Sequence, residues 1–565
     1  MKTNQPNLKK LFKIILLLLA VNFGSHFFFK RFDLTQDKRY TLSETSISIL
    51  QNIKEPLYVD VFLEGNFPGE FKKLQAETQQ LLEEYKAYNS NIIFQFVNPL
   101  ENPDEREQIM QSFMERGLTP MNVTVDDKGK QTQEIIFPWA VINYGKNSTK
   151  VPLLKNMMGA STAEKVVNSV QHLEYAFANG FNTVSKNKEK KIAVLKGNGE
   201  VEDYQLADIL KTVRENYHIA PFTLDSVASN PVNTINELKK YDLVIIAKPT
   251  IAFTDGEKQV LDQYVINGGK SIWLVDHVAM EMDSLMTTGE NLAFPKDLNL
   301  NDLFFKYGIR IQPDLVKDLL ATPIALATGQ QGNATQYTQY PWLFSPMVYP
   351  VTAKNNQKQN PIISNLDAVK FEFTNPIELL KNDIQKTILL QSSPYSKAVG
   401  TPLPISLSMV EDRPEQKEFS NLGNIPLAVL LEGNFKSVYQ NRITAFKDPN
   451  YKPVGKKTKM IVVADGDVIK NQLDKNGVPL ELGYDKWTNY MYANKEFLLN
   501  CINYLLDDNG LINIRNKEVR VSILDKEKVH TNYTLTQIIT VGAPLILLLL
   551  FGIAFTYIRK IKYTK

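Results

Sequence analysis

The sequence predicts an α/β protein whose large middle region lies between two transmembrane helices. A hydrophobic run lies near each end of the chain, and between the runs segments with the pattern of strands alternate with segments that have the pattern of amphipathic helices. This alternation occurs twice. It therefore predicts a first α/β domain, followed by a second domain with a doubly wound parallel sheet.

The two hydrophobic runs predict two membrane spans. Residues 11–29 read LFKIILLLLAVNFGSHFFF, and residues 535–558 carry no charge. About 20 apolar helical residues cross a bilayer, so the second run spans outright and the first spans if Lys13 reaches the interface. A cleaved signal peptide is the alternative for the first run. We expect an uncleaved anchor, because aromatic residues stand where a cleavage site needs small ones.

Basic residues outside the runs predict the orientation. Lys9 and Lys10 precede the first run, and Arg559 and Lys560 follow the second. The positive-inside rule then places both termini in the cytoplasm and the middle outside, in the periplasm of a bacterial inner-membrane protein.

Composition bounds the partners and the redox chemistry. The 565 residues are 43% hydrophobic, and 64 basic residues against 61 acidic ones leave a net charge of +3. Such a balance does not favour a nucleic-acid partner. The only cysteine, Cys501, excludes an intramolecular disulfide, and its helical context is typical of a small buried hydrophobe.

The first domain begins with a helix signal. Thr41 and Glu44 have the spacing of a capping box, which predicts a short helix starting there. Further strand and helix patterns lie at 56–65, 71–88, 91–99, 104–117, 122–127, 134–145, 149–154 and 161–177. A polar, highly charged stretch then suits a linker.

The second domain starts with strands and helices in alternation. Strands are predicted at 191–197, 241–250 and 270–277, and helices at 203–216 and 254–269. The last two strands are continuous apolar runs, which is typical of parallel sheets covered on both faces. The pattern weakens from 313 to 424, with strand-like 370–375 and 386–393, and returns at 425–433, 459–469 and 494–508.

These patterns divide the chain as follows: 1–10 cytoplasmic N-terminus, 11–29 first span, 35–182 first periplasmic domain, 183–191 linker, 192–515 second periplasmic domain with an irregular insertion at 313–424, 516–534 juxtamembrane segment, 535–558 second span and 559–565 cytoplasmic tail.

Motifs for nucleotide chemistry fail in this chain. Residues 269–271 read Gly-Lys-Ser as in a Walker A motif, but position 264 is Tyr instead of the leading glycine, and the triplet precedes a strand. A phosphate would therefore find no helix N-terminus, which excludes nucleotide hydrolysis by this chain. Gly197 and Gly199 form only half of a dinucleotide fingerprint and predict a tight turn.

Candidate site residues are few. The five histidines are scattered without a zinc motif, so we predict no catalytic residue, metal or cofactor. Asp465 and Asp467 follow a buried strand, where open α/β sheets bind ligands, and two acids can hold a divalent cation. An Asp-Gly-Asp sequence also makes an ordinary turn, which is the interpretation we favour.

Residues 241–276, from YDLVIIAKPT to GGKSIWLVD, resemble the class I glutamine amidotransferase-like fold, in which a helix ending in a double glycine leads into a buried strand. Those enzymes need a Cys nucleophile on a sharp turn and a His base. Neither is in place here. The resemblance therefore implies a fold that has lost its catalytic site and keeps a binding or scaffolding role.

Several blocks together resemble the GldG family of gliding-motility ABC-transporter auxiliary proteins of the Bacteroidetes. They are RFDLTQDKRYTLSE, YDLVIIAKPT to GGKSIWLVD, KYGIRIQPDLV, IPLAVLLEGNF, VVADGDVIKN and the final hydrophobic run. The blocks are spread over nearly the whole chain. The resemblance implies an inner-membrane ABC complex with a separate ATPase subunit and a separate polytopic permease subunit, and it implies no catalytic residues and no particular substrate.

The residues and the resemblance together predict a non-catalytic auxiliary subunit, because the chain has too few spans for a translocation path and no nucleotide site. A face of small residues, Gly542, Ala543, Gly552 and Ala554, would pack against permease helices. Two alternatives remain open. One is a structural scaffold of a motility or secretion machine, and the other is a periplasmic ligand-binding or hydrolytic protein that uses Asp276, Asp465 and Asp467.

Overall fold

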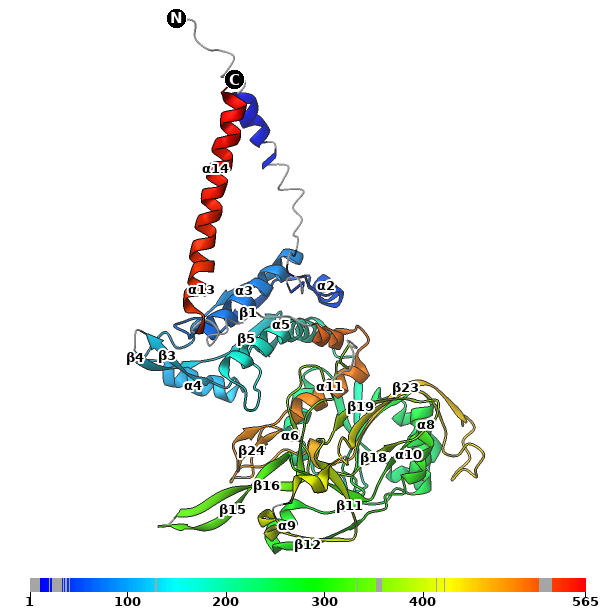
Figure 1. The fold of residues 1–565 in the computed structure, drawn as a ribbon. Helices are drawn as coiled ribbons and strands as arrows, with labels where there is room; N and C mark the ends of the chain where they lie inside the picture. The colour runs from blue at the N-terminus through cyan, green and yellow to red at the C-terminus, as the bar shows by residue number, and fades with distance from the viewer. Residues whose placement is uncertain are drawn as a thin grey trace, which may run out of the picture. The chain divides into compact units, whose positions relative to one another are not determined.

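The computed structural model describes residues 11–19, 21–22, 33, 35, 38–39, 41–127, 130–332, 334–351, 358–412, 414–420, 422–517 and 531–564. The chain divides into two compact units, Met1–Val519 and Arg520–Lys565. Figure 1 labels many of their helices and strands.

A four-stranded sheet of order β2-β1-β5-β6 forms the base of the N-terminal part of the first unit. β1 pairs parallel with β2 and antiparallel with β5, so this α/β sheet is mixed. Its strands and the separate β3–β4 hairpin are β1 (Leu57–Val61), β2 (Ile92–Phe96), β3 (Met121–Asp127), β4 (Lys130–Ile136), β5 (Trp139–Tyr144) and β6 (Asn147–Pro152). The helices are α2 (Glu44–Gln51), α3 (Gly69–Tyr88), α4 (Arg106–Glu115) and α5 (Thr162–Ser185).

Three predicted boundaries in this part differ from the structure. The first helix is capped by Ser43, whose hydroxyl accepts the Ser46 N–H, so the predicted cap at Thr41 is wrong. The single strand predicted at 134–145 is two strands, because Pro138 has no N–H to continue the ladder. Helix α5 continues to Ser185, eight residues beyond the predicted end at 177, because Phe181 and Val184 extend its buried stripe.

A seven-stranded sheet of order β19-β22-β23-β10-β9-β7-β8 forms the base of the C-terminal part. From β23 to β8 neighbouring strands are parallel, whereas β22 is antiparallel to β23 and β19 is antiparallel to β22. The strands are β7 (Lys191–Lys196), β8 (His218–Thr223), β9 (Leu243–Ala247), β10 (Lys270–Leu274), β19 (Gln385–Gln391), β22 (Pro426–Lys436) and β23 (Val454–Val463). The helices are α6 (Ala207–Arg214), α7 (Pro231–Leu238), α8 (Asp255–Ile266), α9 (Met282–Thr288), α10 (Asn301–Tyr307) and α11 (Asn494–Leu506).

Helices cover both faces of this sheet, which is the predicted doubly wound arrangement. Along β7, Ile192 and Val194 belong to a core shared with α6 and α11, while Ala193 and Leu195 belong to a second core shared with α7, α8 and α10. Cys501 lies fully buried in the first core, and burial raises its pKa well above the usual value. The thiol therefore packs as a hydrophobe, as predicted.

The region predicted as an insertion, 313–424, contributes one strand to the main sheet and several small sheets. The strand-like segment at 386–393 becomes β19 at the sheet edge, whereas 370–375 is strand only in β17. Figure 1 shows the long β15–β16 hairpin projecting from this region. The remaining strands of the C-terminal part, inside and outside this region, are β11 (Val278–Ala279), β12 (Glu290–Pro295), β13 (Ile309–Ile311), β14 (Asp314–Asp318), β15 (Ala321–Gln331), β16 (Ala334–Val348), β17 (Val369–Lys370), β18 (Ile377–Leu379), β20 (Ser396–Gly400), β21 (Leu403–Ser406), β24 (Tyr484–Asp485) and β25 (Tyr490–Met491).

Partly buried ion pairs connect the two sheets within the first unit, across the predicted linker at 183–191. Glu496 of α11 accepts hydrogen bonds from Lys155 at 2.9 Å and from Arg515 at 2.8 Å. The carboxylate of Glu174 in α5 pairs with Lys517 at 2.6 Å. Both sheets consequently belong to one compact unit.

The second unit holds one helix long and apolar enough to cross a membrane among the residues that the structure describes. It runs from Tyr533 to Tyr563 over 31 residues and includes the predicted span at 535–558. Its parts are α13 (Tyr533–Gln537), the π-helical η7 (Ile538–Gly542) and α14 (Ala543–Tyr563). The π turn lies next to Pro544, which lacks the N–H that a regular helix needs.

The first predicted span lies largely outside the described residues. Residues 11–19 and 21–22 are helical, and the rest of 11–29 is not described, so this span remains a prediction. Lys9 and Lys10 and most of the predicted juxtamembrane segment also lie outside the described residues.

The small residues of the second span do not form the single face predicted for them. A helix turns about 100° per residue, which places Ala543 and Ala554 together and Gly552 about 180° away from Ala543. Only Ala543 and Ala554 share a face within α14.

Candidate functional site

A group of charged side chains lies at the carboxyl end of the parallel sheet. They follow β9, β10 and β23, which are neighbours in the sheet and end at the same edge. This edge is where open α/β sheets bind ligands. The carboxyl-edge cluster, as we call it, consists of Lys248, Asp276, Glu281, Asp465, Asp467 and Lys470.

Lys248 is the centre of this cluster. Its side chain is 4% exposed, and its Nζ lies 2.6 Å from Asp467 and 2.8 Å from Glu281. Burial alone would lower the pKa of Lys248, but the surrounding carboxylates raise it well above the usual value. Its backbone has a φ of 55°, which costs energy in a residue with a side chain. The lysine is therefore a fixed, buried cation.

Asp467 binds two lysines. Besides Lys248, its carboxylate pairs with Lys470 at 2.8 Å, and Lys470 also lies 3.5 Å from Glu281. Burial would raise the pKa of Asp467, yet the two ammonium groups hold it far below the usual value. Asp467 is consequently ionised and fully engaged.

Asp465 has a different role, since it holds backbone groups. Its carboxyl oxygens accept the N–H of Asp467 at 2.7 Å and the N–H of Glu372 at 2.5 Å. Burial first, and then the charges of Asp467 and Asp276, raise its pKa well above the usual value. Asp276 accepts the N–H of Gly466 at 2.6 Å, so the two carboxyl groups together fix the Asp-Gly-Asp turn.

A second set of charges lies beside the turn. Lys370 of β17 pairs with Asp485 at 3.1 Å and lies 3.9 Å from Glu372. Burial raises the pKa of Glu372 to about 7, although Lys370 opposes the shift. This carboxyl group therefore titrates near neutrality.

The fold brings together Asp276, Asp465 and Asp467, the three acids that a hydrolase would use. Each of them already has a hydrogen-bond or ion-pair partner. Asp276 and Asp465 hold backbone N–H groups and Asp467 holds lysines. No group of three or more His, Cys, Asp or Glu side chains that could hold a metal ion occurs within the described part of the chain. The geometry fits a structural ion network that ties three strand ends to the following loops.

Hydrogen bonds close the point where the strand order of the sheet reverses, between β7 and β9. Thr250 and Ile251 each donate a backbone N–H to the carbonyl of Asn198, at 3.0 and 2.9 Å. A Cβ at Gly199 would lie 2.1 Å from the Thr250 hydroxyl. The half fingerprint is thus a tight turn, as predicted, and its loop packs against the one after β9.

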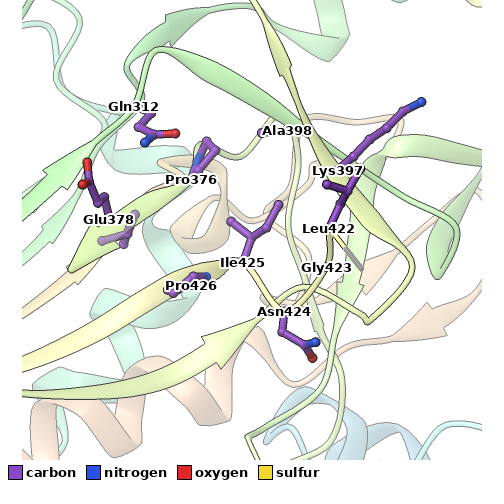
Figure 2. A pocket seen from close by; sticks show the side chains of 11 residues that line it. Gln312, Pro376, Glu378, Lys397, Ala398, Leu422, Gly423, Asn424, Ile425 and Pro426 are labelled. Carbon is purple, nitrogen blue, oxygen red and sulfur yellow. The ribbon is translucent and has the colours of Figure 1, made fainter. Parts of the chain in front are cut away.

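A groove with a volume of about 430 Å³ lies elsewhere, between β18, β20 and the start of β22 (Figure 2). Its two charged lining residues already have partners: Glu378 pairs with Arg310 at 3.1 Å, and Lys397 pairs with Glu418 at 3.3 Å. The groove shares no residue with the carboxyl-edge cluster.

The comparison with protein families decides the relationship of this chain. Residues 189–501, which include the whole parallel sheet and the carboxyl-edge cluster, match the family described as an ABC-type uncharacterized transport system. The match covers more than half of the 565 residues. The chain belongs to this ABC-type transport family. Residues 36–143, in the N-terminal part, match a family described as a domain of unknown function.

This member of the ABC-type transport family is also similar to individual proteins, one compared by sequence and two by structure. An uncharacterized protein of Borreliella burgdorferi is 21% identical over 555 residues, covering 97% of this chain and 96% of the relative. Among solved structures, the mmIFT52 N-terminal domain (15% identity, 56% of this chain and 98% of that one) has a TM-score of 0.31. A putative ThuA-like protein from Parabacteroides merdae (9% identity, 60% and 94%) has a TM-score of 0.26. Scores this low add nothing to the fold described above.

The cluster contains charged residues that we did not predict from the sequence. Lys248, Glu281 and Lys470 were missed, although a lysine directly after the apolar run of the strand predicted at 241–250 was a usable signal. A charge at the end of a fully buried strand has to find a partner, because an unpaired buried charge is very costly.

Proposed function

We propose that this chain is a non-catalytic auxiliary subunit of an ABC-type transport complex in a bacterial inner membrane. One observation carries the proposal: the region that matches the ABC-type transport family belongs to a chain that also holds a helix of membrane-spanning length. In this proposal residues 35–515 lie in the periplasm, over a separate permease, and a separate ATPase supplies the energy.

The site geometry supports the non-catalytic part of the proposal. Every acid of the carboxyl-edge cluster is occupied by a lysine or by a backbone N–H, and the crevice at the strand reversal is closed. Arg559 and Lys560, at the end of α14, support cytoplasmic placement of the C-terminus. The link to gliding motility rests on the resemblance to the GldG family alone.

Purification of the tagged chain in mild detergent tests the proposal. We expect an ATPase and a polytopic permease to be recovered with it. As a matched control, residues 533–563 are replaced by an unrelated single-span helix of equal length, which keeps the anchor and changes the packing surface. Recovery of the native chain without either subunit would contradict the proposal.

The alternatives give different results in two further experiments. If the chain were a hydrolase, Asp276→Asn and Asp467→Asn would abolish its cellular function even where the complex still forms. A subunit that only presents its domains keeps its function in such variants as long as they fold. A scaffold that acts without transport would also work when the partner ATPase carries an inactive nucleotide site, whereas we expect function to be lost.

A further inference from the structure

The β15–β16 hairpin is exposed over its outer part. We call residues 327–330 and 335–340 the distal arm. Nearly all of its side chains are exposed, on both faces of the ribbon, and Figure 1 shows the hairpin projecting outward. A two-stranded ribbon without a covered face is marginally stable in water. The distal arm is thus built in a way that favours additional strand partners.

Both outer edges of the distal arm lack a partner within the described residues. β15 pairs only with β16, and β16 reaches its other neighbour, β17, only at Met347 and Val348 near its base. The register of β15 shifts between Ala327 and Gly329, which kinks that strand. The edge of β16 from Thr335 to Tyr340 runs without such a shift and is the more regular template.

The distal arm carries none of the charges that usually protect such an edge. No charged residue occurs from Leu319 to Ala353, in a chain whose residues are 22% charged. Natural proteins place lysines and other charges on free edges because these oppose pairing with another strand. One of the other edge strands, β6, which pairs only with β5, has Lys150 in it. The neutral edge of β16 is therefore open to a strand that is itself neutral.

A second copy of this chain fits this edge. A strand that pairs with its own copy in antiparallel orientation forms a self-complementary contact, and its Thr, Gln and Tyr side chains meet no like charge. Tyr337 and Trp487 are 54% and 52% exposed, and the centroids of their rings lie 5.9 Å apart. The two rings supply an aromatic surface beside the edge. We propose that two copies of this chain associate through the distal arm, with β16 against β16 in a four-stranded sheet.

Cysteine crosslinking of the full chain in its membrane tests the proposal, which does not rest on the transport role. Gln336→Cys, Thr338→Cys and Gln339→Cys place thiols along the edge, and a short bismaleimide links two thiols that meet. The native chain is the background control because Cys501 is buried. We expect dimers in the edge variants several times above those of Ser148→Cys, a matched exposed position in the edge strand β6.

The dependence of the crosslinking yield on the position of the cysteine distinguishes strand pairing from random collision. A two-fold axis gives strong crosslinking at one position and weaker crosslinking at its neighbours, whereas equal yields along the arm, or yields no higher than those of Ser148→Cys, would overturn the proposal. Adding Gln336→Lys to the Gln339→Cys variant should reduce the dimer to the control level, and Gln336→Asn should leave it unchanged. Crosslinking only to a different protein would also overturn it.

Discussion

At the scale of single residues, Lys248 shows how this protein handles buried charge. Its ammonium group lies between Asp467 and Glu281. Replacing Lys248 with methionine keeps most of the side-chain volume but removes the positive charge that pairs with these two carboxylates. Breaking a buried pair from one side typically costs about 3–5 kcal/mol.

We therefore expect Lys248→Met to lower the free energy of unfolding by about that amount, measured by denaturant titration of the full chain in detergent. The control is Lys240→Met. Its pair with Glu237 has side chains that are 61% and 47% exposed, and such surface pairs contribute about 0–1 kcal/mol. Equal losses in both variants would mean that the cluster does not stabilise the fold.

Glu372 predicts a dependence of stability on pH. Its pKa is raised from 4.5 to about 7, so the folded state binds more protons than the unfolded state between these values. Stability from this group is therefore lost as the pH rises from about 4.5 to about 7. Glu372→Gln stays neutral and escapes this loss, so its stability relative to the native chain should increase across the window, by roughly 2–3 kcal/mol at most. Parallel pH curves for the two proteins would refute the assignment.

At the scale of elements, helix α5 lies close against the N-terminal sheet because of a glycine. A Cβ at Gly180 would come 2.6 Å from Ile142 and 2.8 Å from Val151, which lie in β5 and β6. Gly180→Leu should push the helix off the sheet and cost about 1–3 kcal/mol of stability. The control Gly69→Ala, which meets no atom within 4 Å, should be neutral or slightly stabilising in the same thermal unfolding experiment.

Helix α5 also shows which of its two ends the sequence pattern predicts. Its start was predictable, because Ser161 and Glu164 form a capping box at the beginning of the periodic segment. Its end was placed too early, because the following residues look like a polar linker until Phe181 and Val184 are seen to be buried. Similarly, the segment at 386–393 was assigned to the insertion, and only pairing with β22 makes it part of the main sheet.

At the scale of the whole molecule, Glu174 ties both ends of the first unit to α5. Its carboxylate accepts the Ser43 N–H at 2.7 Å and the Ser46 hydroxyl at 2.8 Å, and it pairs with Lys517 at 2.6 Å. Glu174→Ala should loosen both ends together, because it removes the acceptor of the Ser43 N–H and the charge partner of Lys517. Hydrogen exchange should become at least about tenfold faster in both α2 and η6 (Leu511–Asn516). Acceleration in only one of them would show that the two ends are not coupled through Glu174.

The number of membrane anchors gives a second prediction at this scale. If residues 11–29 span the membrane, a chain without residues 531–565 stays in the membrane fraction after an alkaline wash, because one anchor is left. Removal of residues 1–30 as well should release the chain. Release after the C-terminal deletion alone would contradict the two-anchor prediction.

The sequence by itself determined the class of the protein: hydrophobic runs, strand and helix periodicity and buried apolar strands depend only on local order along the chain. The doubly wound sheet and the C-terminal apolar helix follow from such local patterns, and so does the turn at Gly197 and Gly199. The tertiary structure decided what the acids do. Asp465 and Asp467 looked like possible ligands until folding brought Lys248 beside them from a strand more than 200 positions earlier. Electrostatic partners depend on distance in space, which spacing along the chain does not contain.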